Sequence, residues 1–213
     1  MNDRPVAVIV DLVDSRKIFD RTAAQAAILD GFGTVAAHLP HLQPLHATTA
    51  DEFQAVYPSV AVALEATLLA RLSLPTGIDC RFGIGRGDVY VVGGGAAGPI
   101  QDGSGWWLAR AAIDEAHRRE DSRTPSLRGW FRAADEDAGL ESLVNAYLLS
   151  RDHIVGAMSE RSRRLTLGAM MGRLQGELAQ TEGITQSAVS QALRRSGGAS
   201  LIAAIDELKA VVI

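Results

Sequence analysis

Carboxylates at two places in the first part of the chain have the residue types and placement of a metal site. Asp11 follows the apolar run 6–10, and Asp51 and Glu52 lie between two short runs that are expected to pair as a hairpin. In a split β-α-β sheet, the end of the first strand and the tip of that hairpin lie side by side. Two carboxylates there could hold Mg²⁺ against a triphosphate. The alternative is that Asp51 is an ordinary turn residue.

Two glycine-containing segments could bring the backbone close to a ligand. In residues 81–87 (RFGIGRG), glycines in a predicted strand would let another backbone or a ligand approach closely. In residues 101–110 (QDGSGWWLAR), a glycine-rich loop opens a predicted helix, whose first N–H groups could bind an anion. In both segments the glycines could also be simple bends.

Residues 174–195 (LQGELAQTEGITQSAVSQALRR) have the pattern of a helix-turn-helix. Ala179 is small enough for a close helix contact, Gly183 suits the positive φ of a tight turn, and Thr185 can cap the second helix. On that second helix Val189, Ala192 and Leu193 share one face, which we expect to pack. An ordinary αα-hairpin is the alternative.

The opposite face of the second helix carries side chains that can read base edges or bind phosphate, and no acidic residue interrupts positions 185–195. We expect the N-terminal half of this helix to read bases and its terminal arginines to meet phosphate. The expected DNA contacts are Thr185, Gln186, Ser187, Ser190, Gln191, Arg194 and Arg195.

Charge is distributed unevenly along the chain. Residues 150–213 carry eight basic and six acidic side chains, whereas the whole chain has a formal net charge of −4, so only the C-terminal part suits a polyanion. Because this positive excess is small for a DNA-binding protein, we expect two copies to act together as a homodimer.

Length and composition indicate a globular protein. At 213 residues and 47% hydrophobic, the chain can form one large or two small domains. Cys80 is the only cysteine, which excludes an intrachain disulfide and a two-cysteine metal site within one chain. The N-terminal apolar run is too short for a signal sequence or a membrane span. We therefore expect a cytoplasmic protein that does not bind a membrane.

The pattern of elements changes near residues 134–138. Strand-like runs (6–12, 46–49, 53–58, 78–84 with 88–92, and 127–133) alternate with helical ones (22–39, 60–72 and 104–119). This β-α-β-β-α-β-α-β order predicts a ferredoxin-like, antiparallel-containing sheet with helices on one face, and residues 93–99 read as a flexible loop. Helices are expected at about 138–158, 159–172, 174–180, 185–195 and 199–211. The prediction is an α+β chain with a sheet domain (1–135) and a helical domain (136–213).

The last predicted helix has a broad apolar stripe that must be buried. Packing on the chain's own helix-turn-helix is at least as well supported as a role as the seam of a homodimer. We favour a homodimer because two-fold DNA sites require paired recognition helices. The stripe contains Leu201, Ile202, Ile205, Leu208 and Val212.

Several segments resemble a bacterial protein family. Residues 11–21 (DLVDSRKIFDR), 50–54 (ADEFQ), 81–89 (RFGIGRGDV) and 102–113 (DGSGWWLARAAI) resemble the SatD family, in which a helix-turn-helix follows. The resemblance covers most of the chain. More distantly, the same segments are similar to the catalytic domain of class III nucleotidyl cyclases and diguanylate cyclases, in which a first-strand aspartate and a hairpin aspartate bind metal. By position, these would be Asp11 and Asp51.

Departures from the cyclase pattern suggest the cyclase-like fold rather than cyclase activity. Thr49 and Ala50 replace the hairpin glycines, Ala47 replaces the base-selecting lysine, and the third helix offers Trp107 and Arg110 where cyclases carry asparagine and arginine. Without a correctly placed cation to stabilise phosphoryl charge, turnover should be poor, and we expect no catalytic residue.

Taken together, the sequence predicts a DNA-binding transcriptional regulator with a cyclase-like domain that senses a nucleotide or another small molecule, or that dimerises. The residues expected at a ligand site are Asp11, Asp51, Arg81 and Arg110. The two aspartates could also bind Mg²⁺. One alternative is a metal-dependent nucleotide enzyme that uses the same two aspartates. Another is an adaptor whose helix-turn-helix binds proteins.

Overall fold

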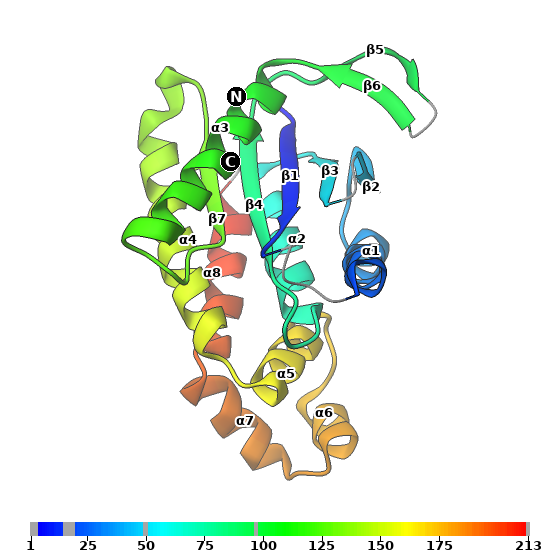
Figure 1. The fold of residues 1–213 in the computed structure, drawn as a ribbon. Helices are drawn as coiled ribbons and strands as arrows, with labels where there is room; N and C mark the ends of the chain where they lie inside the picture. The colour runs from blue at the N-terminus through cyan, green and yellow to red at the C-terminus, as the bar shows by residue number, and fades with distance from the viewer. Residues whose placement is uncertain (1–3, 15–19, 49–50, 96–97, 212–213) are drawn as a thin grey trace.

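The protein has an α+β fold in which a mixed sheet is followed by a run of helices (Figure 1). The computed structural model describes residues 4–14, 20–48, 51–95 and 98–211. Within these residues no helix combines the length and the apolar character that a membrane span requires.

The central sheet has five strands in the order β2-β3-β1-β4-β7. β1 lies in the middle and pairs antiparallel with β3 and β4, and β7 pairs parallel with β4. β2 is an edge strand that contains Pro44, a residue tolerated at an edge because it has no N–H to donate. The strands are β1 (Val6–Leu12), β2 (Gln43–Ala47), β3 (Glu52–Tyr57), β4 (Cys80–Arg86) and β7 (Gly129–Arg132).

Helices cover both faces of this sheet, so the expectation of helices on one face is wrong. Val8 and Val10 of β1 point into the core that contains α1 (Arg21–His38) and α2 (Val60–Ser73). The intervening Ile9 packs instead with α3 (Ser104–Ser122) on the opposite face. The reason is visible in the sequence, because β1 is apolar at successive positions, as in strands buried on both sides.

A two-stranded hairpin, β5 (Tyr90–Gly95) and β6 (Gly98–Asp102), extends from the body at the top of Figure 1. The loop predicted for residues 93–99 is therefore wrong in its described part, because Gly93 pairs with Ile100 and Gly94 with Pro99. Glycine is disfavoured in strands, which explains why the sequence pattern indicated a loop.

Five helices occupy the C-terminal part close to their predicted positions, after a 3-10 turn at Asp135–Asp137. They are α4 (Ala138–Ala157), α5 (Glu160–Met170), α6 (Gln175–Glu182), α7 (Gln186–Arg195) and α8 (Gly198–Ala210).

The apolar stripe of α8 is covered within the same chain. Leu201 and Ile205 are each 2% exposed and belong to the core that includes α2, and Leu208 packs against its edge. Ile202 is half-buried, and Val212 lies outside the described residues. Leu201 and Ile205 are therefore buried within the same chain, in the core around α2 rather than in the core of the helix-turn-helix, and the homodimer stays a prediction.

One hydrophobic core joins the sheet to the C-terminal helices. It contains residues of β1, α1 and α2 together with Val144 and Leu148 of α4 and the α8 residues named above. α2 is buried along most of its length because α1, α5, α8 and the sheet all pack around it. The division at residue 135 stays a prediction, and the core crosses it.

Candidate functional site

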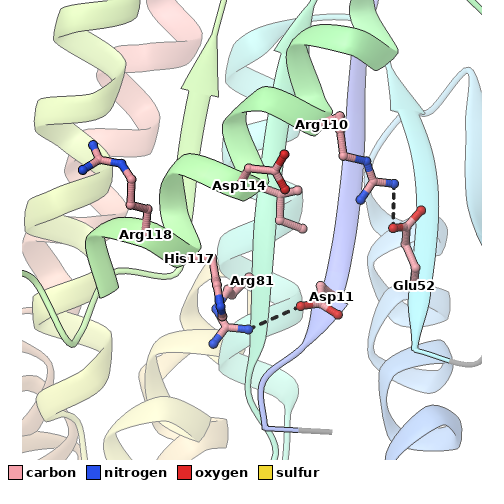
Figure 2. A pocket seen from close by; sticks show the side chains of 8 residues that line it. Asp11, Glu52, Arg81, Arg110, Asp114, His117 and Arg118 are labelled. Carbon is pink, nitrogen blue, oxygen red and sulfur yellow. Dashed lines mark hydrogen bonds and ion pairs between the residues drawn. The ribbon is translucent and has the colours of Figure 1, made fainter. Parts of the chain in front are cut away.

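A polar pocket lies on the α3 face of the sheet, where β1, β3 and β4 meet that helix (Figure 2). Its volume is about 590 Å³ and it is open to solvent. The lining residues are Asp11, Glu52, Arg81, Arg110, Ile113, Asp114, His117 and Arg118.

The glycines of β4 explain why α3 lies so close to the pocket. A Cβ atom at Gly83 would be 2.2 Å from the Ala109 carbonyl oxygen, and one at Gly85 would be 2.3 Å from the Ala109 nitrogen. Of the two roles considered for this glycine segment, the close approach of another backbone is confirmed. Arg81 is the next residue on the same face of β4, so its side chain lies beside α3 at the pocket floor.

Three charged residues form one row across the sheet. Asp11 on β1 is in register with Glu52 on β3 and with Arg81 on β4. Arg81 Nη1 donates to Asp11 Oδ2 at 3.3 Å, and Arg110 Nη2 on α3 donates to Glu52 Oε2 at 2.6 Å. Two acidic and two basic residues of the pocket are therefore already paired with each other.

Asp11 is the exposed member of its ion pair, with a side chain 38% exposed against 8% for Arg81. Burial raises the pKa of Asp11 above its ordinary value, and the charges of Asp51 and Glu52 add to this, whereas Arg81 opposes it. Because the nearby carboxylates outnumber the cation bound to Asp11, a ligand with a positively charged group would be favoured there.

The predicted proximity of Asp11 to the hairpin is confirmed. The Leu12 N–H donates to the Asp51 carbonyl oxygen at 3.2 Å, which places the end of β1 against that turn. The hairpin residue that lines the pocket is Glu52, while Asp51 is not part of the lining. Thr49 and Ala50, which replace the cyclase glycines, lie outside the described residues.

Asp11 and Asp51 are the residues that the sequence leads us to expect at a magnesium site. No group of three or more histidine, cysteine or acidic side chains is arranged to bind a metal in the described part of the chain. Arg81 already binds Asp11, so a metal ion would have to displace this guanidinium or share the carboxylate with it.

The N-terminus of α3, expected as an anion site, uses its N–H groups within the chain. Gly105 N donates to the Asp88 carbonyl oxygen at 3.0 Å, and Gly103 N donates to Asp102 Oδ1 at 2.7 Å. Trp106 N donates to the Gly103 carbonyl oxygen at 3.1 Å. These three groups are therefore not available to an anion.

Sequence reasoning missed the pocket residues that α3 contributes beyond Arg110. Asp114, His117 and Arg118 follow it at helical spacing and line the same pocket. The spacing i, i+4, i+7 and i+8 was the signal that could have found them.

A second candidate site is the hairpin of α6 and α7. Gly183 has a φ of 64°, and the Thr185 hydroxyl accepts a hydrogen bond from Ala188 N at 3.2 Å. The positive φ of Gly183 and the capping role of Thr185 are thus confirmed. The helices share a small core with α5, and its buried residues are Leu165, Leu178, Ala179, Val189 and Leu193.

The outer face of α7 is exposed at every position singled out in the sequence except Ser190, which is half-buried. Within the described residues neither Arg194 nor Arg195 forms an ion pair, whereas Arg164 on α5 binds Glu182 at 2.7 Å. The hydroxyl of Thr185 is used in the cap and also lies 2.9 Å from the Ser187 hydroxyl. The C-terminal end of α7 therefore carries positive charge that nothing in the described chain neutralises.

The family model of the SatD family matches residues 5–203. No curated protein matches the chain.

Proposed function

The chain belongs to the SatD family, and from that membership and the two sites we propose that it is a bacterial DNA-binding regulator of transcription. In this proposal α6 and α7 form a helix-turn-helix that binds double-stranded DNA in the cytoplasm. The sheet half binds a small-molecule effector in the pocket beside α3.

The uncompensated charge at the end of α7 carries the proposal. A recognition helix places its N-terminal half against base edges and approaches the backbone at its other end. Gln186 and Gln191 are exposed where base contacts would be made, and Arg194 and Arg195 are exposed without ion pairs where phosphate contacts would be made. Unpaired arginines bind phosphate without first breaking an existing ion pair.

The pocket supports the effector part of the proposal. An effector with a positively charged group would meet Asp11 and Glu52, and its acidic groups would meet Arg110, which is 49% exposed. A nucleotide is one candidate, with magnesium held by Asp11 and Asp51. We expect weak binding of that metal because Arg81 competes for Asp11.

Fluorescence anisotropy with a selected duplex and a scrambled one, across a salt series, tests the proposal. Gln186→Ala and Gln191→Ala should each weaken binding to the selected site by about 1–3 kcal/mol and have little effect on the scrambled one. Arg194→Ala should weaken both and reduce the salt slope by about one.

Two controls make this test specific. Arg4→Ala removes the same charge from the start of the sheet half, where Arg4 binds Glu136, and should leave the salt slope unchanged. Val189→Asp places a charge in the core shared by α5, α6 and α7, so lost binding there would report unfolding. The adaptor function would be favoured by two results together. The wild type would show no preference for any duplex, and Arg194→Ala would leave the salt dependence of DNA binding equal to that of the wild type.

The second candidate function is a metal-dependent nucleotide enzyme, and the observation that favours it is the contact between the end of β1 and the Asp51 turn. We rank it below the regulator because Asp11 is engaged by Arg81.

A further inference from the structure

Charged groups continue inward from the pocket in an unbroken series, in which each arginine except the last lies between two carboxylates. We call this series the ion-pair chain. Its members, in spatial order, are Asp11, Arg81, Glu120, Arg128, Asp79, Arg71, Asp152 and Arg151.

The first half of the ion-pair chain leads away from the pocket. Besides Asp11, Arg81 binds Glu120 at the end of α3, with Nε 2.5 Å from Oε2. Arg128 then joins Glu120 to Asp79, through Nη1 at 2.9 Å and Nε at 2.8 Å. Glu120 therefore lies between two guanidinium groups.

The second half reaches the C-terminal helices. Arg71 of α2 joins Asp79, at 3.0 Å from Nε, to Asp152 of α4, at 3.1 Å from Nη1. Arg151 closes the series on Asp152 at 2.9 Å and donates to the Thr67 hydroxyl at 2.9 Å. Asp152 and Arg151 are fully buried.

The ion-pair chain is balanced, because its carboxylates and its guanidinium groups are equal in number. A buried charge that loses its partner is costly, so a change of partner at one position favours a change at the next. Asp11 has the most exposed side chain in the series and is where a ligand in the pocket would first touch it.

The inner end of the series fixes α4 against the sheet. Asp152 Oδ2 accepts hydrogen bonds from the Arg128 and Gly129 N–H groups at 2.7 Å each, where β7 begins. α4 is followed directly by α5, which shares a core with α6 and α7.

We propose that the ion-pair chain couples the pocket to α4 and, through it, to the helices α5, α6 and α7. A ligand whose positively charged group binds Asp11 weakens the hold of Asp11 on Arg81, and the series re-pairs as far as α4. This inference rests on the proposed function for its role in regulation, but the coupling itself can be measured without DNA.

Amide hydrogen exchange of the full-length protein tests the coupling. Asp11→Asn should change the exchange rates of amides in α4 by about threefold or more, although Asp11 and α4 share no contact in the series. Glu120→Gln interrupts the series between Arg81 and Arg128. In that background, Asp11→Asn should change α4 exchange by less than about twofold.

Glu115→Gln is the matched control. Glu115 lies on α3 with a side chain 14% exposed, the same as Glu120, and binds Arg118 and Arg119, which are not part of the series. It should leave the response of α4 to Asp11→Asn intact. A response to Asp11→Asn that is confined to the pocket, or that is the same with and without Glu120→Gln, would overturn the inference.

DNA affinity of the same variants separates this inference from the proposed function. If the wild type binds a selected duplex, Asp11→Asn should alter its Kd about threefold or more, and the Glu120→Gln background should suppress the change. If the wild type binds no duplex while α4 exchange follows the expected pattern, the proposed function fails and the coupling stands. If DNA is bound but α4 exchange ignores Asp11, the coupling fails and the proposed function stands.

Discussion

Asp152→Asn should be among the most destabilising conservative substitutions in this protein. Asp152 is fully buried, and its Oδ1 binds Arg71 and Arg151 at 3.1 and 2.9 Å. Its Oδ2 accepts the N–H groups of Arg128 and Gly129. The amide has one acceptor atom in place of two and no charge, so either the arginines or the backbone donors lose their partner.

The magnitude follows from these contacts. Removing one partner of a buried ion pair costs about 3–5 kcal/mol, and a buried N–H without an acceptor costs about 1–3 kcal/mol. Because these costs are not additive, we expect a loss of about 4 kcal/mol in the free energy of unfolding. Domains of ordinary stability have about 5–15 kcal/mol in total, so the variant should be folded but marginal.

Urea denaturation followed by fluorescence of the buried Trp106 and Trp130 measures this loss. With a slope of about 2 kcal/mol per molar urea, the midpoint should fall by about 2 M. Asp206→Asn, the same substitution at an exposed position of α8, should shift the free energy by less than about 0.5 kcal/mol. A midpoint for Asp152→Asn within about 0.5 M of the wild type would refute the reasoning, since the buried arginines would then not depend on this carboxylate.

Four further predictions follow from other features. Gly85→Ala should destabilise the protein by about 1–3 kcal/mol in the same assay, because its Cβ would lie 2.3 Å from backbone atoms of α3, whereas Gly139→Ala in α4 has open space and should not destabilise it. Burial alone would raise the pKa of Asp79, but Arg71 and Arg128 outweigh burial and hold that pKa below its ordinary value of 3.8. The Asp79 carboxylate therefore stabilises the fold above pH 3.8, and this contribution is lost as the pH falls through the folded pKa. Unfolding midpoints between pH 5 and pH 2 should show this fall, and Asp79→Asn should flatten it. Incubation with ATP or GTP and Mg²⁺ or Mn²⁺ should give no cyclic product, and a product that disappears in Asp11→Ala would contradict the regulator function. Sedimentation at micromolar concentration should show a homodimer, and monomer alone, with and without DNA, would contradict it.

Local signals in the sequence predicted local structure well. The small Ala179, the turn at Gly183 and the cap at Thr185 lie within a few residues of each other, and the structure has the expected close packing, positive φ and hydrogen bond at these positions. The alternation of strands and helices also predicted the α+β class, because each period depends only on neighbouring residues.

Features that depend on distant residues were not predictable in the same way. The pairing of Gly94 with Pro99 contradicts the preferences of both residues and is set by the register of the whole hairpin. The ion pair between Arg71 and Asp152 joins residues 81 positions apart, and no spacing rule connects them. The pocket was predicted in part: Asp11 came from its place after a strand, whereas Glu52 became a lining residue only through its register opposite Asp11.

The packing of α8 on α2 has a consequence for synthesis on the ribosome. α2 is made early, yet part of its apolar surface packs against Leu201 and Ile205 of α8, which are translated only after the whole of the sheet. At about 5–20 residues per second, the nascent sheet half waits on the order of ten seconds with that surface exposed. Truncation before α8 would make this exposure permanent, so shortened forms should associate with chaperones or aggregate where the full chain does not.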